Sequence, residues 1–269
     1  MNKLLLRGIV GLVYITIILI SLYSEDIILA GMLLIMNALA VNEIFLIYQK
    51  ASTRKTIWIL TVSSVFFALN SLIILDILSK EYMVANIVIP LIIFFSTFTK
   101  VDRVNLNQTF CHIFSLVYIT IPLLLAVYLN RISVYEGDVG FLMIIFVIVW
   151  ANDTFAYLTG ITLGRHKLYE KISPKKTWEG LAGGLISSVL ISLFFLKYLF
   201  LLKPIEIIIL AVIVSISSVF GDLFESLIKR VVAVKDSGEF LPGHGGILDR
   251  IDSLLIAIPL SLIYYLLIH

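Results

Sequence analysis

The sequence predicts an all-α integral membrane protein with about nine transmembrane helices. Hydrophobic residues make up 60% of the 269 residues, charged residues make up 14%, and the mean hydropathy is +1.07. Soluble domains are nearer half apolar and a quarter charged, so a soluble core is not expected. Apolar runs of about 20 residues, enough to span a bilayer, recur along the whole chain. The chain is therefore predicted to be a polytopic membrane protein.

The spans follow from these apolar runs, taken in order. The opening stretch "MNKLLLRGIVGLVYITIILISLY" has two basic residues before an apolar run, as a signal peptide does. Because it lacks a small-residue cleavage site and further spans follow, we expect a retained first helix. The runs lie at residues 8–23, 27–48, 56–78, 84–99, 108–130, 139–160, 178–202, 205–228 and 251–268.

The basic residues predict the orientation in the membrane. An odd number of spans places the two termini on opposite sides, and Lys and Arg gather on the cytoplasmic side. With a cytoplasmic N-terminus, sixteen of the twenty basic residues lie inside. The outer side then keeps Lys80, Arg131, Lys197 and Lys203. The N-terminus and segments 161–178 and 229–250 are therefore predicted to be cytoplasmic.

The two halves of the chain differ, although no linker or low-complexity tract separates them. Glycine is absent between Gly31 and Gly137, whereas ten of the fifteen glycines lie from Gly160 to Gly246. We therefore predict one transmembrane domain over residues 1–269, with a scaffold half (1–138) and a catalytic half (139–269). A single cysteine, Cys111, excludes an intrachain disulfide, and a net charge of +2 does not suit nucleic-acid binding.

Polar residues inside the last four spans indicate a functional site. A charged side chain within an apolar membrane helix raises the free energy of insertion by about 2.5–3.5 kcal/mol. It therefore usually faces a partner of opposite charge or a water-filled cavity. Asp222, Glu225, Ser226 and Lys229 follow at i, i+3, i+4 and i+7, which places them on one helix face. Helix-end pairing or capping would explain any one of these residues alone. The whole set converges on one membrane side, which favours a site.

Phosphoryl transfer is the chemistry that this set suits. Carboxylates can hold Mg²⁺, while lysines and arginines spread charge over phosphates and glycine amides approach an anion closely. His244 stands among three glycines in "PGHGG", as in a phosphate loop, although a surface turn would explain it equally well. "SPKKTWEG" (173–180) offers two lysines, with Ser173 or Thr177 able to cap the next helix. The alternative for this stretch is a cytoplasmic loop without a specific role, which is basic only because Lys and Arg gather on that side of the membrane.

Three motifs between residues 152 and 252 carry a family resemblance. Ser226-x-x-Lys229-Arg230, four further residues, Lys235-Asp236 and then "FLPGHGGILDRID" (240–252) resemble the signature of the phosphatidate cytidylyltransferase (CDP-diacylglycerol synthase) family. The stretches "NDTFAYLTGITLGR" (152–165) and "SPKKTWEG" (173–180) are similar to two further family stretches. The first half of the chain resembles the family only as a hydrophobic scaffold.

The resemblance implies transfer of a cytidylyl group from CTP to phosphatidate, giving CDP-diacylglycerol and pyrophosphate in phospholipid biosynthesis. It implies an active site at the cytoplasmic rim of a bacterial cytoplasmic membrane, with Mg²⁺ or another divalent cation held by Asp222 and Asp249. The catalytic residues that it implies are Asp222, Ser226, Lys229, Arg230, Asp249 and Arg250. The substrate-binding residues that it implies are Asn152, Asp153, Lys175, Lys176, Thr177, Lys235, Asp236, His244, Gly245, Gly246 and Asp252.

The sequence also bears on rival functions and on single residues outside the motifs. A transporter would need a polar path, but outer stretches such as "FLMIIFVIV" are apolar. CDP-alcohol phosphatidyltransferases carry a run of spaced aspartates that is missing here, whereas CTP-dependent polyprenol kinases share a looser form of the motif.

Glu43, in the first half, suits an inter-helix hydrogen bond. Spaced small residues allow close helix packing, within the chain or in a homodimer. These are Ala156, Gly160, Gly164, Gly180 and Gly184.

Overall fold

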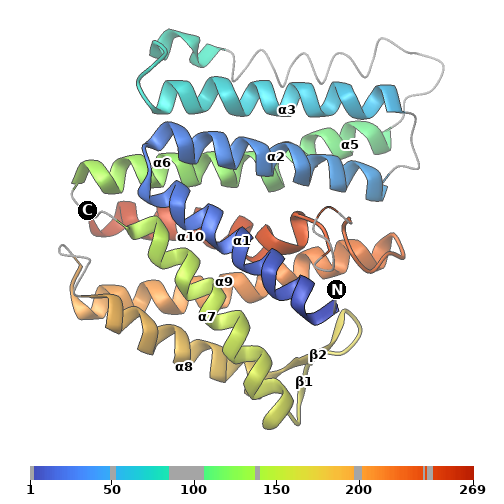
Figure 1. Ribbon diagram of the computed structural model, residues 1–269, viewed down its shortest axis with the longest axis vertical. Coiled ribbons are helices and arrows are strands. Elements are labelled where there is room, and N and C mark those ends of the chain that lie inside the picture. The colour runs from blue at the N-terminus through green and yellow to red at the C-terminus, as the bar shows by residue number, and fades with distance from the viewer. Residues whose placement is uncertain are drawn as a thin grey trace. The chain divides into compact units, whose positions relative to one another are not determined.

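The computed structural model describes residues 3–48, 53–84, 106–136, 140–196, 202–238, 240 and 245–269. Over these residues the chain is almost entirely helical, which confirms the all-α class (Figure 1). Six of the described helical segments are long and apolar enough to cross a membrane. They are Asp26–Ile47, Cys111–Val134, Phe141–Thr162, Trp178–Phe195, Pro204–Val231 and Leu248–Ile268. The shorter apolar helices Gly8–Tyr23 and Leu60–Ile74 also match predicted spans, and the predicted span 84–99 lies outside the described residues.

Contacts within the chain group it into two compact units, and each combines segments that are distant in sequence. Unit 1 comprises residues 1–131 and 236–248, and unit 2 comprises residues 132–235 and 249–269. The division near residue 131 lies close to the predicted boundary between the scaffold and catalytic halves. Segment 236–248, which carries much of the signature, nevertheless belongs to the unit of the scaffold half. The single domain stays a prediction.

Unit 1 is built around α2 (Asp26–Tyr48), which packs against α1 (Lys3–Tyr23) and α3 (Thr53–Ile74). It also packs against α5 (Leu106–Ser115) and the π-helical turn η2 (Leu116–Thr120), which continues into α6 (Ile121–Glu136). A short 3₁₀ helix, η1 (Lys80–Val84), follows α3. Aliphatic and aromatic side chains fill this core, since Leu33, Ile44, Phe67 and Ile119 are at most 1% exposed.

Unit 2 contains α7 (Phe141–Thr162), α8 (Trp178–Phe195), α9 (Pro204–Val231) and α10 (Leu248–Ile268) except its first residue. Helix α7 runs along α8, which also packs against α9. Small residues permit the α7–α8 contact: a Cβ on Gly180 would lie 2.7 Å from the Ala156 carbonyl oxygen. The close packing predicted from these small residues is therefore used within the chain, and the homodimer stays a prediction.

A β-hairpin joins α7 to α8, where the sequence predicts only a loop. Strands β1 (Lys167–Tyr169) and β2 (Ser173–Thr177) pair antiparallel (Figure 1). Thr177 caps α8, because its hydroxyl accepts a hydrogen bond from the Gly180 N–H at 3.0 Å. The carboxylate of Glu179 accepts from the backbone N–H groups of residues 165 and 166, which ties the start of the hairpin to the first turn of α8.

Candidate active site

The C-terminal half of α9 presents a polar face in an otherwise apolar helix. The Ser226 hydroxyl donates to Asp222 Oδ1 at 3.2 Å, and Lys229 Nζ donates to Glu225 Oε2 at 2.7 Å. Both bonds join residues four apart, the spacing that places side chains on one side of a helix. The predicted single face is therefore confirmed.

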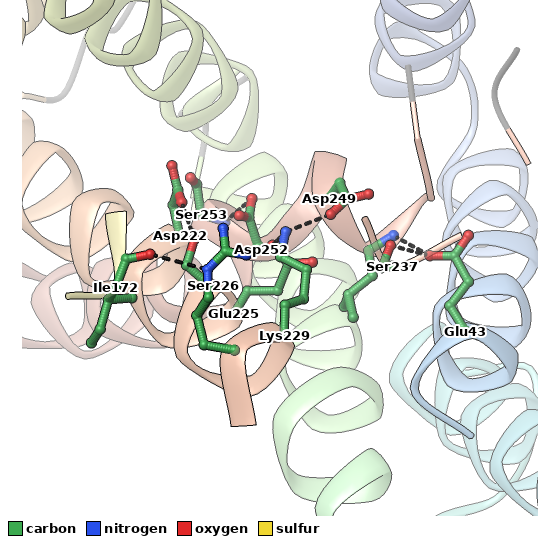
Figure 2. A network of polar contacts seen from close by, with 12 residues as sticks. Glu43, Ile172, Asp222, Glu225, Ser226, Lys229, Ser237, Asp249, Asp252 and Ser253 are labelled. Carbon is green, nitrogen blue, oxygen red and sulfur yellow. Dashed lines mark hydrogen bonds and ion pairs between the residues drawn. The ribbon is translucent and has the colours of Figure 1, made fainter. Parts of the chain in front are cut away.

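Lys229 lies between two carboxylates from different helices of unit 2. Its Nζ is 2.7 Å from Glu225 Oε2 on α9 and 2.6 Å from Asp249 Oδ1 in the first turn of α10 (Figure 2). The Lys229 and Asp249 side chains are each 11% exposed and that of Glu225 is 1% exposed. Two opposite charges attract each other much more strongly here than at the surface, because little water screens them. Each charge is stable in this buried position only while its partner is present. Lys229 thus fixes Asp249 relative to α9.

Two contacts attach the hairpin to the same stretch of α9. Lys176 Nζ, from β2, lies 2.8 Å from Asp222 Oδ2, and these side chains are 23% and 35% exposed. Arg230 Nε donates to the backbone oxygen of Ile172 in the hairpin turn, at 3.4 Å. Lysine has three N–H donors, so Lys176 can bind Asp222 and still offer donors to a phosphate. The hairpin that carries "SPKKTWEG" therefore lies beside the part of α9 that carries Ser226-x-x-Lys229-Arg230.

Two more carboxylates of unit 2 interact with this group. Asp153 on α7 is exposed, whereas Asp252 on α10 is 7% exposed and accepts from the Ser253 N–H at 2.7 Å. The carboxyl groups of Asp153, Asp222 and Asp252 lie near enough to one another to interact electrostatically, as do Lys176 and Arg250 with Asp153. Carboxylates from α7, α9 and α10 are thereby collected in one region, together with lysines and arginines that can balance them.

Two residues predicted to bind substrate form bonds that hold helices in place. Asn152 is fully buried: its Nδ2 donates to Ser218 Oγ at 3.0 Å, and Ser215 Oγ donates to its Oδ1 at 2.6 Å. These bonds join α7 to α9. Thr177 is buried as the cap of α8. Direct contact of either residue with a substrate stays a prediction.

The remaining predicted residues lie in exposed positions or in the signature segment. Lys175, Arg230, Lys235, Asp236 and Arg250 are exposed. Gly245 adopts a positive φ of 84°, which an L side chain rarely takes, and Gly246 is buried. His244 lies outside the described residues.

Glu225 and Glu43 were not among the predicted site residues. The signal for both was an acid within an apolar run, and Glu225 also shares the polar face of α9. The inter-helix hydrogen bond expected for Glu43 forms, because its carboxylate on α2 accepts from the N–H of Leu248, the first residue of α10. The same carboxylate also accepts from the Ser237 hydroxyl and from the backbone N–H of Ile247, two bonds that the sequence did not predict.

The donor set suits a hard cation that shares its ligands with phosphate. Among the residues described, no group of three or more His, Cys, Asp or Glu side chains is arranged to hold a metal by itself. Mg²⁺ commonly uses one or two carboxylates and completes its shell with waters and phosphate oxygens. Asp222 and Asp249, from α9 and α10, offer carboxylate oxygens of this kind, and their binding of a cation stays a prediction.

Comparison with known proteins gives one family. Residues 5–268 match the profile of the "Cytidylyltransferase family". The phosphatidate cytidylyltransferase of Staphylococcus haemolyticus is 36% identical over 210 residues, which cover 75% of this chain and 78% of that protein. That of Haemophilus influenzae is 42% identical over 154 residues, 54% of each chain. That of Staphylococcus epidermidis is 47% identical over 121 residues, 45% of this chain and 46% of that protein. The latter two alignments span about half of the relatives' length.

Proposed function

The chain belongs to the cytidylyltransferase family, and on this premise we propose that it is a bacterial phosphatidate cytidylyltransferase. It transfers the cytidylyl group of CTP to phosphatidate, giving CDP-diacylglycerol and pyrophosphate. The relatives that bear this name are bacterial, and the chain is an integral membrane protein. A cytoplasmic N-terminus and a site at the cytoplasmic membrane surface complete the proposal. One substrate is soluble while the other is anchored in the leaflet, so a site at the interface serves both.

The observation that carries the proposal is the meeting of the hairpin and α9 at Lys176 and Asp222. Lys176 belongs to the motif "SPKKTWEG", and Asp222 lies one helical turn before the motif Ser226-x-x-Lys229-Arg230. An isolated ion pair would be sufficient for packing alone. Here Asp153, Asp252 and Arg250 add further charges around it, as phosphate chemistry with a divalent cation requires.

The reaction needs charge neutralisation and alignment more than proton transfer. A phosphate oxygen of phosphatidate attacks the α-phosphorus of CTP, a new P–O bond forms, and the bond from the α-phosphorus to the bridging oxygen of the leaving pyrophosphate breaks. A phosphate monoester is already ionised near neutral pH, so no general base is required. Lys175, Lys176 and Arg230 neutralise phosphate charge, while Lys229 holds Asp249 in place.

Asp222 and Asp249 are the residues that would hold Mg²⁺ or a similar divalent cation. A bound cation would supply electrostatic stabilisation of the charge on the transferring and leaving phosphates. Asp222→Asn and Asp249→Asn should each lower turnover by at least about a hundredfold, because several kcal/mol of that stabilisation is lost. Unfolding temperature in detergent controls for folding. Activity within tenfold of wild type in either variant would remove that residue from the metal site.

Position-specific labels test the reaction itself. Purified protein is incubated with phosphatidate, Mg²⁺ and CTP labelled with ³²P at either the α- or the γ-phosphorus. Cytidylyl transfer puts the α-label in the lipid and the γ-label in pyrophosphate. A CTP-dependent lipid kinase would instead put the γ-label in the lipid and the α-label in CDP. The second pattern, or no lipid product under conditions where the protein is folded, would refute the proposed function.

A further inference from the structure

Glu43 makes three hydrogen bonds to the signature segment within unit 1. Its Oε2 accepts from the Ser237 hydroxyl at 2.8 Å and from the Leu248 N–H at 2.9 Å. Its Oε1 accepts from the Ile247 N–H at 2.8 Å. Figure 2 shows the carboxylate pointing toward Ser237. One side chain on α2 thus binds both ends of the stretch 237–248.

The segment leaves space for this carboxylate through two glycines. A Cβ added to Gly238 would lie 2.8 Å from Glu43 Oε1, and one added to Gly246 would collide with Glu43 Oε2 and the Ser237 hydroxyl. Glu43 itself is 4% exposed. A carboxylate buried in this way is tolerated only when its oxygens are hydrogen-bonded. The glycines and the acid therefore fit each other, and changing either alters the other's environment.

Helix capping explains only part of this arrangement. The Ile247 and Leu248 N–H groups stand at the start of α10, where a negative charge is favourable. A cap would need no contact with Ser237 at the other end of the segment. The added bond means that one side chain holds two described parts of this loop, residues 237–238 and 245–248, and the second part contains the predicted phosphate-binding residues Gly245 and Gly246. The peptide bond after Leu248 leads directly to Asp249.

We propose that Glu43 is a positioning residue that holds residues 245–248, with Gly245 and Gly246, in the conformation needed to bind the phosphates of CTP. The inference rests on the proposed function for the identity of the nucleotide. Glu43 does not contact the nucleotide; it acts through the backbone of the loop. The carboxylate matters because both of its oxygens accept hydrogen bonds, from three donors in total. An amide has only one acceptor oxygen and cannot replace it.

Glu43→Gln is the sharpest variant because it preserves size. Whichever way the amide turns, its NH₂ group replaces one carboxylate oxygen and faces the N–H of Ile247 or Leu248, which then loses its acceptor. We expect faster hydrogen–deuterium exchange at residues 247 and 248. We also expect the Kd for CTP, measured by calorimetry with the detergent-solubilised full chain, to rise about tenfold, a typical size for indirect coupling. Ser237→Ala removes one donor and keeps both backbone bonds, so its effects should be smaller.

Val41→Ala is the matched control. Val41 is fully buried on the same helix, and its truncation lowers stability without touching the carboxylate. It should lower the unfolding temperature but leave the Kd for CTP unchanged. If Glu43→Gln leaves exchange at residues 247 and 248 as in wild type, the loop is not held by Glu43. If exchange rises but CTP binds as before, or if Val41→Ala weakens CTP binding equally, the positioning role is wrong. A wild-type protein that binds CTP without transferring its cytidylyl group would refute the proposed reaction and leave this inference standing.

Discussion

Replacing Lys229 by methionine should uncouple α10 from α9 and destabilise the protein. Methionine keeps most of the length and apolar stem of lysine but removes the charge and the donors. The group formed by Lys229, Glu225 and Asp249 holds one positive and two negative charges, separated by 2.7 and 2.6 Å. Without the lysine, two carboxylates face each other with no cation between them.

The magnitude follows from burial. None of the three side chains is more than 11% exposed, so water screens the lost interaction weakly. Removing one partner of a buried ion pair typically costs about 3–5 kcal/mol, chiefly because the other charge is left unpaired. We expect the free energy of unfolding to fall by this amount. Turnover should also fall, because Asp249 loses the contact that orients it.

Thermal or denaturant unfolding in detergent measures the loss, and two further variants identify its cause. Glu225→Gln combined with Lys229→Met restores the original net charge of the group, so part of the stability should return while activity stays low. Lys203→Met makes the same change at the start of the same helix. Lys203 pairs with Glu206 at 3.3 Å, but its side chain is 77% exposed, so no measurable loss is expected.

Two results would refute this reasoning. The first is a Lys229→Met variant that unfolds like wild type and like Lys203→Met, which would mean that the buried pair contributes no net stability. The second is recovery of full activity in the double variant, which would mean that Asp249 does not need Lys229 for its orientation.

The remaining predictions concern orientation and the two substrates. In a background without the native cysteine, a cysteine at Lys171 should react with an impermeant maleimide only from the cytoplasmic side, and one at Lys203 only from outside; the opposite pattern would invert the topology. Lys176→Ala should raise the KM for CTP more than that for phosphatidate, because the lysine lies on the hairpin between two spanning helices, where a water-soluble nucleotide can reach it. Arg230→Ala should lower kcat or raise the phosphatidate KM, because it lies at the end of a membrane helix. Steady-state kinetics in mixed micelles decide the last two, and a reversed pattern would exchange the assignments.

Much of the fold was available from the sequence because it depends on local patterns. Long apolar runs can be satisfied in a bilayer only as helices, so composition and run length indicate both class and spans. Helical periodicity alone places Asp222 and Lys229 on one face. Spaced small residues such as Gly180 marked the close approach of α7 and α8. The family resemblance, carried by the order of polar residues and glycines, is likewise confirmed.

The partners of these residues were decided by tertiary structure alone. Nothing local to Lys229 indicates that Asp249, on another helix, would accept its second bond, or that Lys176 would pair with Asp222. Glu43 is the clearest case, because its bond to Ser237 joins residues 194 positions apart. The period of a helix fixes which side chains share a face, but which face meets which depends on how whole helices pack. Charge pairs across that packing are therefore properties of the fold, while the residues able to form them are already present in the sequence.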